Sequence, residues 1–169
     1  ALKVFLRVDN SVEDLLLGAL WTAARVMCEN YTSVFCNDTA DNFKLHLDNW
    51  PADSMITISA APFKAVSAVK YYDGDDVLQT LAASDYSADF VSKIGRIKLD
   101  ESPTVKDRLN AVEVTMTCGY DEAAVPKPMI QAMMMITANL YERRGDAVPP
   151  NKITLGFEFP AAVKALLDT

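Results

Sequence analysis

GYDEAAVPKPMIQAMMMITANLYERRGD, residues 119–146, is the stretch that decides the fold. Its second half predicts a helix that begins near Pro128, where a missing N–H costs nothing, and ends before Gly145, which suits a positive φ. Helical spacing places the following side chains on one face: Ile130, Met133, Met134, Thr137, Leu140 and Tyr141. Met135 and Ile136 lie outside that face, so the helix is apolar nearly all round. Such a helix must be buried on more than one side, either at the centre of its domain or against another chain.

Length and charge narrow the class of protein. A chain of 169 residues predicts one domain, residues 1–169, with room for a sizeable insertion. The formal charge of −7 argues against nucleic-acid binding through phosphate neutralisation, although the protein could still lie beside DNA without gripping it. Three cysteines are too few and too odd a number for a disulfide framework, which indicates a reducing compartment. The sequence holds no apolar run of 18 residues, so no membrane span is predicted.

The N-terminal region predicts a long helix over residues 12–31. Ser11 and Asp14 resemble a capping box in which Asp replaces Glu. Arg25 and Glu29 have the i, i+4 spacing of a surface ion pair. The apolar stripe expected to face the core consists of Val12, Leu15, Leu16, Ala19, Leu20, Ala23, Val26 and Met27.

The middle of the chain, residues 43–118, changes from a helical period to the period of two that is typical of strands. The residues Asp73-Gly74 form a strong hairpin signal within it. Alternation is clearest at 111–118, where every second side chain is apolar. Strands are predicted over residues 43–47, 55–58, 66–71, 77–81, 86–90, 94–99 and 111–118. The fold class is therefore α+β, a small helical bundle with a β-rich insertion at about 43–118.

The C-terminal region combines a connector with a short helix. Residues 147–150, AVPP, predict a rigid extended connector, and residues 153–157 an extended segment. A last helix, PAAVKALLD, is predicted to start at Pro160. A helix this short is marginal alone, so it needs a surface to dock on, in its own chain or in another.

The residues alone indicate no catalytic, cofactor or metal site. His46 is the single histidine, and the sequence shows no partner that would make it a general base. Cys28, Cys36 and His46 lack the spacing of zinc ligands. The acidic turn at 73–76 lacks the distal Glu of a calcium loop. The methionine run at 133–135 is better explained by packing or by contacts with a partner than by metal binding.

Four stretches, taken in order, resemble the head–tail connector (adaptor) proteins of long-tailed bacteriophages, which gene transfer agents also carry. They are LKVFLRVDNSVEDLLLGALWTAARVMCENYT (2–32), ISAAPFKAVSAVKYYDGDDVLQTLAASDY (58–86), AVEVTMTCGYDEAAVPKPMIQAMMMITANLYERRGD (111–146) and PAAVKALLD (160–168). The third is the most specific, with a strand, Gly-Tyr, Val-Pro and a helix that closes on Leu-Tyr-Glu-x-Arg. The chain departs from the family at Glu101-Ser102-Pro103, where relatives often carry a Trp before the Pro.

The resemblance implies a structural role in the virion neck and no enzymatic activity. Proteins of this family form a ring, usually of twelve copies, on the portal protein beneath the head. The ring extends the DNA channel and offers an attachment surface to the stopper or tail-terminator protein, and DNA passes through without specific binding. Assembly in the host cytoplasm, no cofactor and no membrane partner are implied. Whether the particle is a phage or a gene transfer agent stays open.

The resemblance, together with the apolar pattern, leads us to expect three kinds of contact. Contacts between subunits are expected at Trp21 and Met135. Contacts with the portal are expected along one side of the last helix, at Val163, Leu166 and Leu167. Contacts with the next ring are expected at the hairpin turn, at Asp73, Gly74 and Asp75. The alternatives are a ligand-binding module or small enzyme with its site in the β insertion, and another neck or tail-completion protein.

Overall fold

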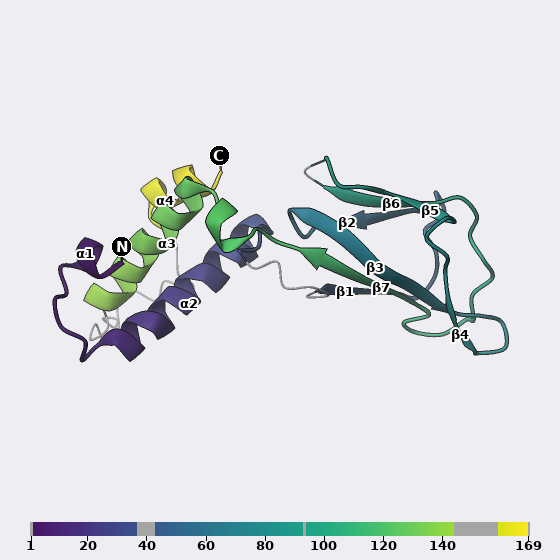
Figure 1. The fold of residues 1–169 in the computed structure, drawn as a ribbon, viewed down its shortest axis with the longest axis horizontal. Helices are drawn as coiled ribbons and strands as arrows, with labels where there is room; N and C mark the ends of the chain where they lie inside the picture. Colours follow the sequence, from purple (N-terminus) through teal and green to yellow (C-terminus); the bar gives the residue numbers. More distant parts are fainter. Residues whose placement is uncertain (1, 37–42, 93, 144–158, 169) are drawn as a thin grey trace, which may run out of the picture. The chain divides into compact units, whose positions relative to one another are not determined.

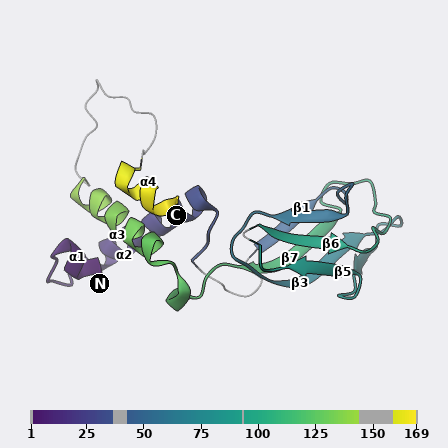
Figure 2. The ribbon, with the colours of Figure 1, turned by 90° about the horizontal axis from the view of Figure 1, so that it is seen from above.

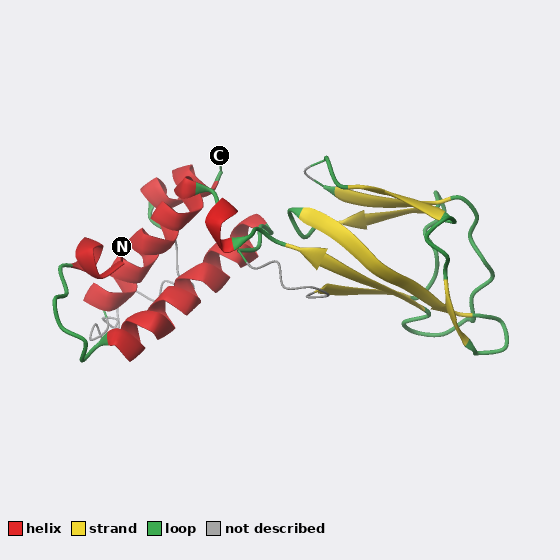
Figure 3. Ribbon diagram, in the orientation of Figure 1, coloured by secondary structure: helices red, strands yellow, loops and turns green. Residues whose placement is uncertain are grey.

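The computed structural model describes residues 2–36, 43–92, 94–143 and 159–168. Helices and strands are both present, and the strands lie between helices in the chain, so the predicted α+β class is confirmed (Figures 1 and 3). The chain divides into two compact units. A helical unit combines Ala1–Thr32 with Val125–Thr169, and a β unit comprises Ser33–Ala124.

The helical unit is built around the predicted central helix. Its helices are α1 (Leu2–Leu6), α2 (Asp14–Thr32), α3 (Lys127–Glu142) and α4 (Ala161–Leu167). The α3 helix contacts each of the other three (Figure 1). It begins one residue earlier than predicted, after Pro126 at the N-cap, and Pro128 occupies the first turn. Gly145, the predicted end of this helix, lies outside the described residues.

The buried face of α3 is rotated from the predicted one. The buried side chains are Met129, Ala132, Met133, Ile136 and Thr137. Ile136, which we placed outside the face, has no exposed surface, whereas Met134 and Leu140 are only half-buried. The prediction was wrong because polar residues normally mark the outer side of a helix, and α3 carries too few of them. The hydroxyl of Thr137 donates to the Met133 carbonyl at 2.8 Å, which satisfies it inside the core.

The α2 helix turns a different side toward the unit than the sequence predicts. Its buried residues are Leu17, Ala24, Cys28 and Glu29. Much of the predicted core stripe is exposed instead, with Leu15 at 92% and Val26 at 42%. The predicted Arg25–Glu29 pair is present, with 3.9 Å between the charged groups. The α2 helix therefore has two apolar sides, and only one of them packs within its own unit.

The α4 helix docks on its own unit. Of the two docking surfaces that the sequence left open, one in its own chain and one in another chain, the structure shows the first. Val163 has no exposed surface. Next to the helix, the Tyr31 phenol donates to the Asp168 carboxylate at 3.1 Å, and the Tyr31 ring meets Phe159 edge-on with centroids 5.3 Å apart. This hydrogen bond raises the pKa of Tyr31. The predicted connector 147–150 and extended segment 153–157 lie outside the described residues.

The β unit consists of two antiparallel sheets (Figures 2 and 3). The first sheet has the order β1-β7-β3-β4 and the second the order β2-β6-β5. Every predicted strand is present, and β3 starts three residues before its predicted beginning. The strands are β1 (Phe43–Leu47), β2 (Met55–Ile58), β3 (Phe63–Tyr72), β4 (Leu78–Thr80), β5 (Tyr86–Asp89), β6 (Gly95–Leu99) and β7 (Val112–Cys118), followed by the short 3₁₀ helix η1 (Glu122–Ala124).

The core of the β unit is a single cluster of apolar side chains drawn from both sheets. The apolar side chains of the alternation predicted at 111–118 are all buried on β7: Val112, Val114, Met116 and Cys118. Burial raises the pKa of the Cys118 thiol to about 11. Gly95 opens β6 where the Phe63 side chain comes so close that a Cβ would lie 2.6 Å from its ring. The missing side chain is thus a requirement of packing at this position.

Candidate functional site: interaction surfaces

Several charged side chains among the described residues of the β unit pair with one another. His46 on β1 lies opposite Glu113 on β7. The Lys44 ammonium donates to the Glu113 carboxylate at 3.1 Å, and this bond holds the pKa of Glu113 below its ordinary value. Arg108 pairs with Asp76 at 2.9 Å. Glu113 and Arg108, one from each pair, line a polar pocket together with His46 and Lys70.

The residues that the sequence analysis weighed as metal ligands can be located in the fold. Cys28 belongs to the helical unit, whereas Cys36 belongs to the β unit. Throughout the part of the chain that the structure describes, no three His, Cys, Asp or Glu side chains are placed to hold a metal ion. The same residues contain no helix long and apolar enough to cross a membrane.

An exposed apolar surface runs along α2 and the residues before it. We call it the α2 stripe; its members are Val12, Leu15, Leu16, Ala19, Ala23 and Val26. Val12 is 88% exposed and Leu15 is 92% exposed. Ala19 and Ala23 carry small side chains one turn apart, which would let another helix approach closely. A continuous apolar surface of this kind is typical of a protein–protein contact.

Neither of the two residues expected at subunit contacts belongs to the α2 stripe. Trp21 on α2 and Met135 on α3 are both half-buried. Each keeps some exposed surface for a partner. The sequence pattern missed the α2 stripe as a contact surface because it assigned those residues to the core.

The residues expected at the portal divide into two groups. Val163 is buried inside its own unit. Leu166 and Leu167 are half-buried at the end of α4 and keep exposed surface. The portal contact remains a prediction, and the part of it that a partner could reach is at Leu166 and Leu167.

The structure brings together the residues expected at the next ring, in the turn between β3 and β4. The Asp73 carboxylate accepts hydrogen bonds from the backbone of Asp75 and Val77 and, at 2.8 Å, from the Gln79 amide. The Gln79 bond is the main reason that the pKa of Asp73 is lowered. The ammonium of Lys106, a residue outside the turn, donates to the Gly74 carbonyl at 3.2 Å. The turn is thus held in one conformation and offers a polar, acidic surface.

A second turn, between β5 and β6, offers an apolar surface that the sequence reading overlooked. We call it the β5–β6 tip; its members are Phe90, Val91 and Ile94, which are 47%, 96% and 54% exposed. A turn that carries large apolar residues without Gly or Pro is unusual for a solvated loop, and this was the available signal.

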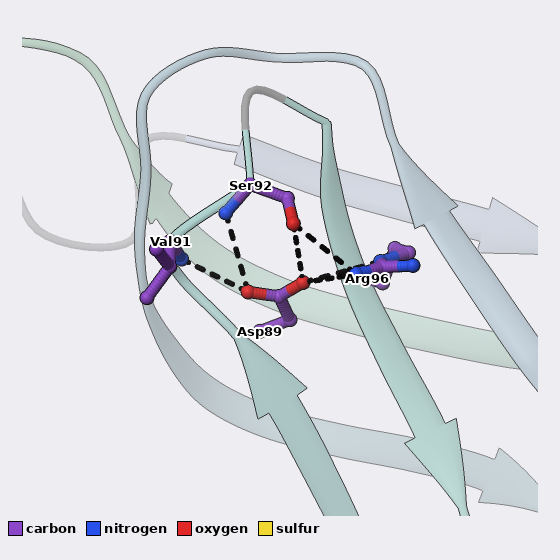
Figure 4. A network of polar contacts seen from close by, with 4 residues as sticks. All are labelled: Asp89, Val91, Ser92 and Arg96. Carbon is purple, nitrogen blue, oxygen red and sulfur yellow. Dashed lines mark hydrogen bonds and ion pairs between the residues drawn. The ribbon is translucent and has the colours of Figure 1, made fainter.

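A single carboxylate holds the β5–β6 tip in place (Figure 4). Asp89 accepts hydrogen bonds from the Val91 amide at 3.0 Å and from the amide and hydroxyl of Ser92. It also forms an ion pair with Arg96 on β6. The Ser92 hydroxyl and the Arg96 guanidinium hold the pKa of Asp89 well below its ordinary range. The Phe90 ring lies 4.9 Å from that of Phe63, which anchors the base of the tip.

A groove lies between the free edges of the two sheets, along β1 and β2. Its volume is about 200 Å³. The apolar side chains that line it are Phe35, Phe43, Leu45, Ile58, Ala60 and Met116. We call it the β1–β2 groove.

Neither a protein-family model nor a curated protein matches the chain. Several solved structures do match the chain. A chain from the neck of an empty gene transfer agent (GTA) particle, computed with C6 symmetry, has a TM-score of 0.78 and 24% identity over 99% of this chain and 85% of that one. The chain has the fold of a GTA neck chain.

Two further structures agree. A chain of the native GTA virion has a TM-score of 0.74 and 26% identity, covering 95% of this chain and 78% of that one. A chain from the neck of a native GTA particle, computed with C12 symmetry, has a TM-score of 0.71 and 23% identity over 98% of this chain and 85% of that one. The resemblance to neck proteins of the head–tail connector kind, stated from the sequence, is thereby confirmed at the level of the fold.

Proposed function

We propose that this protein is a structural component of the neck of a GTA or phage particle. Copies of it form a closed ring that docks on the portal protein, extends the DNA channel and offers an attachment surface to the stopper or tail-terminator protein. The similarity in fold to neck chains, over nearly the whole of this chain, supports the proposal.

The single observation that carries self-assembly is the α2 stripe. Leu15 is 92% exposed although its helix has a second apolar side that packs within the unit. Leaving such residues in water loses about 1.5–3 kcal/mol of potential burial for each large side chain. A neighbouring copy that covers the stripe recovers this energy in the assembled ring, where two different faces of each subunit meet.

The charge of the protein fits a channel through which DNA moves. With a net charge of −7, a ring of copies carries no excess of cations to retain phosphate. A neutral or negative channel wall leaves DNA free to pass. The acidic β3–β4 turn and the exposed part of α4 are then the surfaces for the next ring and for the portal, at Asp73, Gly74 and Asp75 and at Leu166 and Leu167.

The test of this function is assembly, measured by size-exclusion chromatography with light scattering, alone and with the portal protein of the same particle. The native chain is expected to form rings, or to form a complex once the portal is present. Leu15→Glu, which puts a charge in the α2 stripe, is expected to remove that assembly. Leu109→Glu is the matched control, since Leu109 is 75% exposed in the β unit and outside the stripe. A native chain that stays monomeric and does not bind the portal would refute the proposal.

A further inference from the structure

Two apolar features are exposed among the described residues of the β unit. One is a projection, the β5–β6 tip, where Val91 is 96% exposed. The other is a depression, the β1–β2 groove, with a volume of about 200 Å³. A cavity of about 150 Å³ lined by apolar side chains is large enough for benzene, so the groove can receive one branched aliphatic or phenyl side chain.

The sheet register fixes where the two features lie. Gly95, which follows the tip, pairs with Ile58, which lines the groove, so both features are at the same end of the β unit. The strand order β2-β6-β5 places the groove at one lateral edge and the tip toward the other. Figure 2 shows the corresponding arrangement, with β1 along one side and β3 and β5 along the other.

The tip is already in the form that a docking element needs. Asp89 holds the backbone on the β5 side of the turn through bonds to the Val91 and Ser92 amides, and Arg96 on β6 pairs with Asp89 (Figure 4). An element that is rigid before binding loses little conformational entropy on binding. The backbone that carries Val91 is therefore held by these bonds before any partner binds.

We infer that the β1–β2 groove of one copy receives the β5–β6 tip of the next copy, with Val91 inserted between β1 and β2. The occupant is a second copy because an apolar projection and an apolar groove large enough for one side chain lie at the same end of the unit, the groove at one edge and the projection toward the other. A contact between two different faces generates a ring when its rotation closes. The inference rests on the proposed function, and it assigns to the β unit a lateral contact that the α2 stripe of the helical unit does not provide.

Disulfide trapping tests the contact directly. The full chain, with Cys36→Ser to remove the half-buried native thiol, receives Val91→Cys at the tip and Ser59→Cys on the exposed rim of the groove. Oxidation at high protein concentration is expected to yield a ladder of covalent oligomers longer than dimers. Each single variant can yield at most a dimer. The matched control combines Ser59→Cys with Val77→Cys, since Val77 is 52% exposed beyond β3, at the opposite end of the unit.

A second measurement separates this contact from ring formation in general. Val91→Asp is expected to raise the concentration at which half of the protein assembles at least tenfold, with unchanged circular dichroism, and Val77→Asp to leave it within twofold. If Val91→Asp forms rings normally and the Val91→Cys/Ser59→Cys pair yields no ladder, the tip–groove contact is overturned and the neck function stands. A native chain that never self-associates overturns both. Assembly that depends on the groove but not on Val91 shows that another segment occupies the groove, and this also overturns the inference.

Discussion

Replacing Gly95 with Ala tests how closely the two sheets of the β unit pack where the β5–β6 tip begins. The added Cβ would lie 2.6 Å from Cδ1 and 2.7 Å from Cβ and Cγ of Phe63. The Cβ of Phe63 is tied to the backbone of β3 and cannot swing away. The ring has little freedom either, because Phe63 is only 4% exposed and the Phe90 ring lies 4.9 Å from it. Either β6 or β3 must shift.

Overpacking of this kind destabilises a protein by about 1–3 kcal/mol. With a urea dependence of about 2 kcal/mol per molar, a loss of about 2 kcal/mol lowers the unfolding midpoint by about 1 M. Fluorescence can follow the β unit alone, because Trp50 packs against its core whereas Trp21 lies in α2. The measurement is therefore made in a Trp21→Phe background.

The matched control is Gly18→Ala, the same chemical change at an exposed position inside α2 where no atom lies within 4 Å of the added Cβ. Alanine is the better helix former by about 0.5–1 kcal/mol, so this substitution is expected to stabilise the helical unit. Adding Phe63→Leu to Gly95→Ala should restore part of the lost stability, with a coupling of about 0.5–3 kcal/mol in a double-mutant cycle. A Gly95→Ala midpoint equal to that of the parent, or a cycle without coupling, would show that the close approach does not constrain the sheets.

Three further outcomes follow from the same structure. A thiol reagent at pH 8 should modify Cys36 rapidly in the native protein, and Cys28 and Cys118 only after unfolding. Cys28 and Cys118 are fully buried, and the pKa of Cys118 is raised to about 11. Equal labelling of all three cysteines in the native protein would contradict this prediction. The pKa of Asp89 is depressed in the folded state. The stability that the Asp89 carboxylate contributes is therefore complete above the unfolded pKa of about 4 and is lost as the pH falls below that value. Asp89→Asn should reduce the fall in stability at acid pH, as measured by urea unfolding, and an unchanged fall would contradict this prediction. Met135→Glu, at a half-buried position, should impair assembly by at least tenfold in light scattering while the monomer stays folded, and unchanged assembly removes Met135 from the subunit contact.

The strands were predicted well because each one is marked by a local pattern in the sequence. Alternating side chains mark β7, and the Asp73-Gly74 turn separates β3 from β4. What the sequence could not supply was the pairing of strands. The order β1-β7-β3-β4 brings the first strand beside the last, and such long-range pairing leaves no signal in a single sequence.

The helical faces were harder to predict, for a physical reason. Hydrophobic periodicity identifies the buried side of a helix only when the other side is polar. On α3, Ile136 was placed outside the face although it is fully buried, because apolar residues surround the helix. The β5–β6 tip was missed because Phe90 was assigned to the end of the strand predicted at 86–90 and Val91 to the short link after it. The bonds that Asp89 makes to this turn leave no such local pattern.

The error on α2 carries the most information about function. The stripe that includes Leu15 and Val26 has the spacing of a core face, and yet the unit buries the side that contains Leu17 and Ala24. Both sides are apolar, and the helical unit supplies a partner for only one of them. Selection for solubility alone would place charged residues at the outer side, since an exposed apolar face favours association. Under the ring assembly proposed above, the periodicity correctly marks the stripe as a buried face, and a neighbouring copy rather than its own unit buries it.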